Sequence, residues 1–588
     1  MPIMPINTKN NLVSGTIFPD YGHPLSQSCN EKIEIENSQL TEKIEFIGPF
    51  LKYVGTDSAK FNWLGSVLII TKELFRSPTL TVFQPNNVDF TIHIEGFLLD
   101  HGYHALRDKC FWRFDLRVPL GPESSDVEYG YYVNDEKTAF NSFYVAGRKT
   151  KFWNWSFYSC NGFNGLSEEA KQEIEGVTPL WRDVMFRHAQ KPMHVMIGGG
   201  DQVYADQVWT KHNKIKEWLS LKGKQNRAEY PWSRELEDEI SSFYYTLYVT
   251  SWEDQYVKNA FASIPQVNVL DDHDIWDGYG SYPEILSNAN VYKGCGKIAI
   301  QFYLLFQHHT TMERASIDGY FGKGNASYNF IREFGPSTAV LLVDSRCERT
   351  VEEVVSQDSW EMIFRELNKL TCQHLIVVTG VPVIHPRMKW AETQTKRFHK
   401  VKLSCTSFAN GVKSKVPFLS GGVEYIKKKL GKGGLLKPLI NQFGLPELDD
   451  DLMDHWTHPN HIVERRMMVE KLQEISRTNK VRVTFLAGDV HLCTAGKFFN
   501  AAFEGSLDCH LMYQVTSSAI GNVPPPKVVV DITEKQGKKT HELNSETYER
   551  MIQLFQKETT KSFHNDLESL EKDLPTIAYN LRIPPIMG

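Results

Sequence analysis

Short hydrophobic runs separated by turn-forming residues dominate the first part of the chain. Residues 67–71, 79–83, 90–94, 111–118 and 129–133 are rich in β-branched and aromatic side chains, and Gly, Pro and Asn lie between them. Runs of this length and composition are typical of strands joined by tight turns. The pattern predicts an N-terminal antiparallel β domain over residues 1–150.

The pattern changes after residue 150, where amphipathic segments of ten or more residues begin to alternate with short apolar runs. The clearest helical segments are 232–258, 360–370 and 461–476. Alternation of helices with short buried strands is typical of an α/β fold. We therefore expect a second, α/β domain over residues 151–526. A polar helical C-terminal tail is expected over 527–588, with Asn544 or Ser545 as the cap of a helix at 546–557.

Six of the apolar runs end in small or polar residues. These runs occupy residues 193–206, 266–280, 338–349, 374–382, 481–491 and 510–522. In α/β sheets, ligands bind beyond the carboxyl ends of the strands. The six ends are therefore expected to converge on one site.

The residues at these ends are rich in Asp and His. Carboxylate oxygens and imidazole nitrogens bind hard and borderline metal ions, and two ions close together need a shared carboxylate. A strand-ending Asp can instead cap a helix or a turn, but three Asp/His clusters are hard to explain in that way. The candidates are Asp201, Asp271, Asp272, His273, Asp274, Asp489 and His491.

A phosphate-binding loop and a serine hydrolase site are the alternatives to a metal centre. Gly198, Gly199 and Gly200 could form a phosphate-binding loop, but neither GxxxxGK[ST] nor GxGxxG is present there. A serine hydrolase would need a G-x-S-x-G elbow, which the sequence lacks. Both alternatives are weaker than a metal site.

Composition narrows the class of protein. The chain has 588 residues and a net charge of −6, and no apolar stretch approaches the roughly 20 residues of a membrane helix. The N-terminus does not resemble a secretory signal, and the nine cysteines are odd in number and scattered, as expected of reduced thiols. We expect a cytoplasmic protein without a transmembrane segment.

Charge is unevenly distributed. Residues 385–440 hold 13 Lys or Arg against two Glu. The stretch at about 387–440 has weak periodicity and is interpreted as a basic insertion in the second domain. Such an excess predicts contact with an anionic surface, although a solvated insertion is the plain alternative.

Five motifs together resemble the alkaline phosphatase D (PhoD-like) branch of the calcineurin-type metallophosphoesterases. The resemblance extends over about residues 152–526 and keeps the order of the motifs. It implies a metallophosphatase-type two-sheet β-sandwich flanked by helices, behind the N-terminal antiparallel β domain. The motifs are GGGDQVYAD (198–206), LDDHDIWDGYG (270–280), VDSRCER (343–349), LAGDVH (486–491) and VTSSAIGNVPPP (515–526).

The resemblance also implies roles for individual residues. Asp201 would bridge two metals, and Tyr204 and Cys160 would ligate a ferric ion. For Cys160, a buried inert thiol is the alternative. Asp272 would ligate the second metal, and His273 matches the catalytic histidine.

The later motifs are matched less closely. Asp489 and His491 match the final Gly-His-x-His motif, with Asp in place of its first His. Asp274 stands where the family more often has Glu, which puts any orienting contact to His273 in doubt. Arg346 could clamp substrate phosphate as a substrate-binding residue, or form a salt bridge with Asp344 or Glu348.

These features predict a metal-dependent hydrolase of phosphoric esters, either a phosphatase or a phosphodiesterase. A metal-bridging hydroxide would attack phosphorus while His273 protonates the leaving group. The resemblance implies iron with calcium in a binuclear or multinuclear site, and zinc or manganese stays open. The alternative is a scaffold on a decayed fold that binds anionic lipid, nucleic acid or protein through the Lys-rich insertion. The intact ligand set argues against decay.

Overall fold

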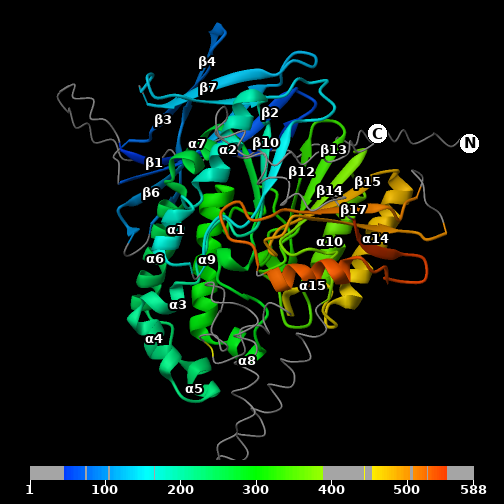
Figure 1. Cartoon of the computed structure of the whole chain (residues 1–588). Coiled ribbons are helices and arrows are strands. Elements are labelled where there is room, and N and C mark those ends of the chain that lie inside the picture. The colour runs from blue at the N-terminus through cyan, green and yellow to red at the C-terminus, as the bar shows by residue number, and fades with distance from the viewer. Residues whose placement is uncertain are drawn as a thin grey trace, which may run out of the picture.

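The computed structural model contains two large β-sheets, one small sheet and the helices that cover them (Figure 1). It describes residues 45–72, 76–102, 106–134, 136–164, 166–387, 443, 453–502, 508–525 and 527–552. The expected basic insertion therefore lies outside the described residues from residue 388 onward. Among the described helices, none is both long and apolar enough to cross a membrane.

The first large sheet joins N-terminal strands to the start of the α/β region. Its order is β5-β6-β2-β1-β11-β10-β9. Strand β1 pairs parallel with β11, with Lys52 opposite Gln266, and antiparallel with β2. The strands are β1 (Phe46–Asp57), β2 (Asn62–Lys72), β5 (Phe97–His101), β6 (Lys109–Pro119), β9 (Trp155–Tyr158), β10 (Val195–Gly199) and β11 (Gln266–Val269).

The small sheet is wholly antiparallel, with the order β4-β3-β7-β8. Its strands are β3 (Thr79–Gln84), β4 (Asn87–Glu95), β7 (Val127–Val133) and β8 (Asn141–Val145). The predicted antiparallel β structure of the N-terminal region is thus confirmed. These strands are nevertheless divided between two sheets, and residue 150 does not separate one sheet from another, because β1 hydrogen-bonds to β11.

The second large sheet has the order β12-β13-β14-β15-β17-β16-β19-β18, and β13, β14, β15 and β17 run parallel. All six predicted runs contain a strand, namely β10, β11, β13, β14, β15 and β17. The strands are β12 (Phe330–Phe334), β13 (Thr338–Leu342), β14 (His374–Thr379), β15 (Arg482–Ala487), β16 (Thr494–Phe499), β17 (Met512–Thr516), β18 (His541–Glu542) and β19 (Tyr548–Ile552).

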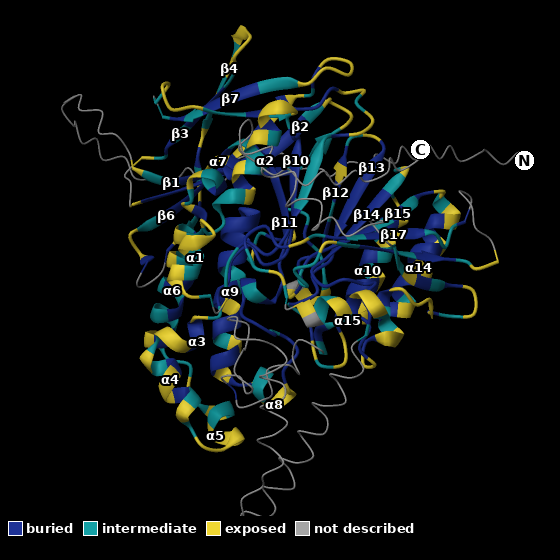
Figure 2. Ribbon diagram, in the orientation of Figure 1, coloured by how far each residue is buried: buried dark blue, intermediate teal, exposed yellow. Residues whose placement is uncertain are grey.

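Alternate side chains of the second sheet pack against different layers. Val340 and Ile376 belong to the core shared with the first sheet. Leu341 and Val377 lie in a separate core with Trp360 of α10 (Gln357–Leu367). Because successive strand residues point to opposite faces, the second sheet is covered on both sides. The predicted two-sheet α/β sandwich with flanking helices is confirmed, and the central strands β10, β11 and β13 are buried along their whole length (dark blue in Figure 2).

The remaining described helices flank the two sheets. The predicted segment 232–258 is divided into α6 and α7, because Asp254 accepts hydrogen bonds from Tyr256 N and Val257 N and begins a new helix. The helices are α1 (Glu168–Glu173), α2 (Thr178–Gln190), α3 (Val208–Lys211), α4 (Asn213–Ser220), α5 (Lys224–Glu229), α6 (Arg234–Trp252), α7 (Gln255–Ser263), α8 (Glu284–Ser287), α9 (Asn290–His308), α14 (Ile462–Asn479), α15 (Lys527–Gly537) and the 3₁₀ turns η2 (Asp272–Asp274) and η3 (Lys323–Asn325).

The C-terminal region differs from the predicted polar helical tail. Only α15 is helical among the described residues 527–552. The prediction of a helix that begins at residue 546 is wrong. Strand β19 lies there instead, pairs antiparallel with β16 and adds to the second sheet. Asn544 does accept backbone hydrogen bonds from Glu546 N and Thr547 N, but it stabilises a turn between β18 and β19. Residues 553–588 lie outside the described part.

Candidate active site

The carboxyl ends of parallel strands from both large sheets meet at one place. Cys160 lies two residues beyond β9, Asp201 two beyond β10, and Asp489 two beyond β15. Backbone hydrogen bonds join these ends, from Cys160 N to Gly200 O at 3.1 Å and from Gly521 N to Cys160 O at 3.1 Å. The structure thus brings all the predicted metal ligands into one region.

Four of these residues have an uncommon backbone conformation. The φ angles of Cys160, Asp201, Asp489 and His491 are 59°, 58°, 66° and 54°. Left-handed φ values cost free energy for residues other than Gly, and they concentrate at functional sites. Each strand therefore ends in a sharp turn that directs a candidate ligand into the shared site.

One group of candidate ligands surrounds Tyr204. Its Oη lies 3.1 Å from His491 Nε2 and 3.5 Å from Asp201 Oδ2. The ligand atoms of Cys160, Asp201 and His491 all lie within 4.8 Å of one another. Nδ1 of His491 is 3.1 Å from the carbonyl oxygen of Val523, which fixes the ring with Nε2 toward the group. Burial raises the pKa of the Cys160 thiol and of the Tyr204 phenol.

A second, carboxylate-rich group shares residues with the first. Asp201, Asp272 and His273 form one set with ligand atoms within 4.8 Å, and Asp271, Asp272 and Asp489 form another. Within the part of the chain that the structure describes, three buried oxygens accept no hydrogen bond: Asp201 Oδ1, Asp271 Oδ2 and Asp272 Oδ1, of which the last lies 3.4 Å from Arg346 Nη2. Burial raises the pKa of Asp201 and of Asp489, and the neighbouring carboxylates add to both shifts. These oxygens fit hard cations, which would supply the missing partners.

Asp206 holds the ring of His273. His273 Nδ1 is 3.0 Å from each carboxylate oxygen of Asp206, and the imidazole stacks on Tyr204 with ring centroids 4.3 Å apart. Asp206 Oδ1 is itself fixed by the backbone N–H of Asp277 at 2.8 Å. Burial lowers the pKa of His273, but the carboxylates of Asp206, Asp272 and Asp277 outweigh this effect and raise it well above the ordinary value.

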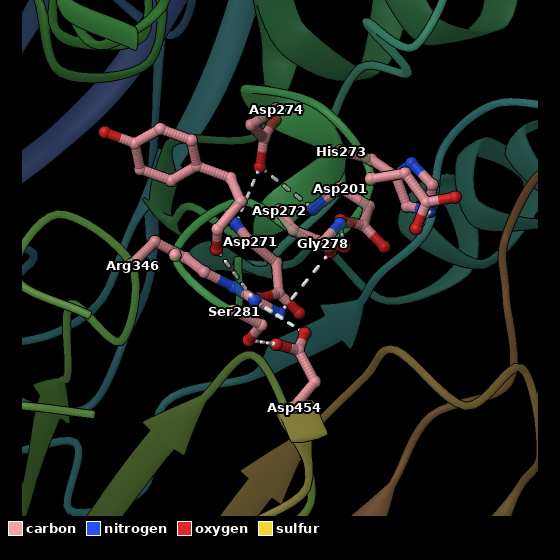
Figure 3. Close-up of polar contacts among 12 residues, drawn as sticks. Asp201, Asp271, Asp272, His273, Asp274, Gly278, Ser281, Arg346 and Asp454 are labelled. Carbon is pink, nitrogen blue, oxygen red and sulfur yellow. Dashed lines mark hydrogen bonds and ion pairs between the residues drawn. The ribbon is translucent and has the colours of Figure 1, made fainter. Parts of the chain in front are cut away.

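Asp274 does not contact His273. Its Oδ2 accepts hydrogen bonds from Asp201 N and Asp271 N, each at 2.9 Å (Figure 3). Its Oδ1 accepts a hydrogen bond from Gln307 Nε2 at 3.0 Å. The carboxylate therefore ties the turn after β10 to the turn after β11. The orienting contact that the sequence left in doubt is provided by Asp206 instead.

Arg346 lies beneath the site with no exposed surface. It forms ion pairs with Asp271, with Asp454 (Nη1 to Oδ2, 2.5 Å) and with Asp272 (Nη2 to Oδ1, 3.4 Å). Asp454 also bonds to Ser281 (Figure 3). The guanidinium does not pair with Asp344 or Glu348. Asp344 accepts backbone hydrogen bonds from Tyr328 N, Arg346 N and Cys347 N, and Glu348 accepts them from Lys323 N and Ser356 N.

The triple glycine serves close packing. A Cβ on Gly200 would come within 2.5 Å of the Asp271 Cβ, and Gly200 has a φ of 109°. A Cβ on Gly380, which follows β14, would come within 2.6 Å of both Asp271 carboxylate oxygens. The lack of side chains at these two glycines allows the two sheets to approach each other around Asp271. The turn after Gly200 does not lead directly into a helix, as a phosphate-binding loop would.

Two residues of the site were missed from the sequence. Asp206 stands in the GGGDQVYAD motif, so its presence there was a usable signal. Asp454 lies 108 residues beyond Arg346 and outside every motif, and no local pattern points to it.

The chain is similar to a yeast protein and, more distantly, to two solved structures. A Saccharomyces cerevisiae protein described as "Uncharacterized protein YGR266W" is 28% identical over 593 aligned residues, covering 90% of this chain and 79% of that protein. A structure of PhoD aligns with a TM-score of 0.47 at 13% identity, covering 81% of this chain and 77% of the other. The purple acid phosphatase PPD1 of yellow lupin (Lupinus luteus) aligns with a TM-score of 0.43 at 10% identity, covering 82% and 66%.

A family model also matches the chain. The model of the PhoD-related phosphatase family matches residues 123–572, which is most of the chain. The match includes every strand end that contributes to the candidate site. The chain belongs to the PhoD-related phosphatase family.

Proposed function

We propose that the protein is a metal-dependent hydrolase of phosphoric esters. The observation that carries the proposal is a group of buried carboxylates, Asp201, Asp271 and Asp272, beside an imidazole held by a carboxylate. Among the described residues, Asp201 Oδ1 and Asp271 Oδ2 have neither a hydrogen bond nor an ion pair. Membership of a phosphatase family supports the same reaction class. A phosphate ester is the substrate class that this chemistry fits.

Metal ions would be held by two overlapping sets of residues. Cys160, Asp201, Tyr204 and His491 offer sulfur, oxygen and nitrogen donors to one ion. Asp201, Asp272 and Asp489 offer oxygen donors to another. Bound cations would activate water and neutralise charge on the phosphoryl oxygens.

His273 acts as the general acid. Because Asp206 accepts a hydrogen bond from Nδ1, the proton on Nε2 is the one available to the site. Nε2 faces away from Asp206 and lies 4.0 Å from Asp277 Oδ1. His273 donates this proton to the leaving alkoxide, and Asp206 stabilises the imidazolium before transfer.

Arg346 acts as a positioning residue. Its guanidinium is fully buried and occupied by three carboxylates, so it is not presented to a substrate in the manner of a phosphate clamp. It pairs with one oxygen of Asp271 and with Oδ1 of Asp272, which holds both carboxylates in place and leaves Asp271 Oδ2 without a hydrogen bond among the described residues.

Metal analysis combined with hydrolysis tests the proposal. Purified protein should contain metal and should hydrolyse phenyl phosphate or bis(4-nitrophenyl) phosphate. A chelator should remove metal and activity together, and returned metal should restore both. Metal-replete protein that hydrolyses neither ester would contradict the proposal and favour the scaffold alternative.

Visible absorption tests whether iron occupies the Tyr204 group. A phenolate or thiolate bound to ferric iron absorbs visible light, whereas d¹⁰ zinc does not. Tyr204→Phe should shift or bleach the band, and Cys160→Ser should perturb it separately. Cys372→Ser is the matched control and should leave the band unchanged, because Cys372 precedes β14 and so lies at the end of that strand away from the candidate site. Active iron-loaded protein without colour would exclude both residues as ferric ligands.

A further inference from the structure

A large cavity adjoins the candidate active site. It has a volume of about 910 Å³ and lies among the segment before α1, the start of α2, the residues around α3, and one face of α6. These elements occupy the same side of the molecule in Figure 1. The volume is within the range of pockets that bind small organic molecules.

The cavity reaches residues that border the proposed metal ligands. Tyr204 and Asn161 both line it, and Asn161 follows Cys160 directly. The Asn161 side chain is fixed, because its Oδ1 accepts a hydrogen bond from Trp181 Nε1 at 2.8 Å and its Nδ2 donates to the Gln202 carbonyl oxygen at 3.3 Å. The wall between cavity and site is therefore made of ordered side chains.

One face of α6 provides hydrogen-bonding groups along the cavity. Asp238, Ser242, Thr246 and Thr250 are spaced by four residues, so they lie in a row on the helix. Asp238 Oδ1 is buried without a hydrogen-bond partner among the described residues. The row thus offers hydroxyl groups and an unsatisfied carboxylate oxygen to whatever occupies the space.

The neighbouring charges favour hydrogen-bond donors. Glu239 Oε2 is also buried without a hydrogen bond, 3.8 Å from His212 Nδ1. Of the two lysines in the lining, Lys171 is paired with Glu168 at 2.8 Å. Carboxylates outnumber lysines around the cavity, so a second phosphate group would be repelled.

We propose that this cavity receives the alcohol portion of the substrate and selects leaving groups rich in hydrogen-bond donors, such as polyols or amino alcohols. The inference rests on the proposed hydrolase function. Asp238 and Glu239 accept hydrogen bonds from hydroxyl or ammonium groups, and Ser242 and Thr246 bond to further hydroxyls. The phosphoryl group is then directed past Tyr204 toward the metal ligands.

Leaving-group selectivity tests this proposal. We would measure kcat/KM for sorbitol 6-phosphate, phosphoethanolamine and phenyl phosphate, and express the first two relative to the third. Wild-type protein should favour at least one donor-rich ester. The double variant Asp238→Asn, Glu239→Gln should lower that ratio by about tenfold or more, through KM, since hydrogen bonds to charged groups are the stronger ones.

Two further variants separate a binding role from a general defect. Glu235→Gln removes one charge from the exposed first turn of the same helix and should leave the ratio unchanged. Thr246→Trp fills the cavity from an exposed position and should lower the ratio as well. Loss confined to phosphoethanolamine identifies an ammonium site, and loss confined to sorbitol 6-phosphate identifies a polyol site.

The failures of the two proposals are distinguishable. Hydrolysis of phenyl phosphate with ratios that neither the double variant nor Thr246→Trp changes would overturn the leaving-group pocket and leave the hydrolase standing. If the metal-loaded protein hydrolyses neither these three monoesters nor a diester, the proposed hydrolase function itself is overturned.

Discussion

Two buried charged regions lie near opposite ends of β11, and they use their charges differently. The acidic region follows the end of the strand and contains Asp271, Asp272 and the residues around them. The basic region surrounds Lys52, which pairs with Gln266 at the start of β11. One residue connects the two regions, because Gln307 accepts a hydrogen bond from Lys52 Nζ and donates one to Asp274 Oδ1.

The central groups of the basic region have partners within the protein. Lys52 Nζ lies 3.3 Å from Gln307 O and 3.1 Å from His308 Nδ1. Arg113 pairs with Asp115 at 2.7 Å and Asp318 at 2.9 Å. Burial lowers the pKa of Lys52 well below its usual value, and Arg332 and Arg113 lower it further.

The acidic region has too few cations of its own. Among the described residues, Arg346 and Arg349 are the arginines that pair with Asp454, and of these two only Arg346 also pairs with Asp271 and Asp272. Carboxylate oxygens of Asp201, Asp271 and Asp272 are left without a hydrogen bond. The comparison separates buried charged groups that have protein partners from buried carboxylate oxygens that lack a hydrogen bond among the described residues, and the second kind marks a candidate place for an external ion.

Removal of a shared carboxylate should have the largest effect. Asp201→Asn should release most of the metal and lower hydrolysis of phenyl phosphate by roughly 10³-fold or more, because Asp201 belongs to both ligand groups. Metal analysis and steady-state kinetics measure this. Asp183→Asn on α2, whose carboxylate pairs with Arg187, is the control and should change neither. Full activity in Asp201→Asn would refute the assignment.

The second prediction separates an acid from a ligand. His273→Ala should lower kcat by about 10² to 10⁴-fold, most for esters with poor leaving groups, and should keep the metal. Asp206→Asn should cost about 10 to 100-fold, since it acts only through His273. Because His273 also lies within 4.8 Å of Asp201 and Asp272, metal loss from His273→Ala would identify it as a ligand instead.

The third prediction concerns the cation of the acidic region. Arg346→Met should lower the free energy of unfolding by about 3 to 5 kcal/mol, because it leaves the buried Asp271 and Asp272 without their arginine and Asp454 with Arg349 alone. Denaturant unfolding measures the change. Arg365→Met, at an exposed position on α10, should stay within about 0.5 kcal/mol of wild type. An equally small effect at Arg346 would show that the carboxylates are neutral or otherwise satisfied.

The smallest effect is expected in the basic region. Lys52→Met should lower the free energy of unfolding by about 1 to 2 kcal/mol at pH 9, where it loses hydrogen bonds to Gln307 O and His308 Nδ1, and should leave metal content unchanged. Folded Lys52 loses its proton at a lower pH than unfolded lysine, so its contribution to stability increases as pH rises toward 10.5. The variant should therefore gain less stability than wild type between pH 7 and 9. Loss of metal from Lys52→Met would contradict the distinction between the two regions, because it would show that the basic region also supports metal binding.

The sequence alone was sufficient for the local features. Hydrophobic runs and their polar ends predicted β10, β11, β13, β14, β15 and β17, and the motifs at those ends drew attention to residues that the structure brings together. This succeeded because a buried parallel strand needs a short apolar run and because the residues that follow it lie at one edge of the sheet.

The partners of these residues were decided by the tertiary structure. Arg346 bonds to Asp454, far along the chain, while the nearby Asp344 accepts backbone hydrogen bonds. Likewise β1 joins β11, and β19 is a strand because β16 offers it an edge. Periodicity and residue type specify how a segment can pair or ionise, but long-range burial selects which partner it meets.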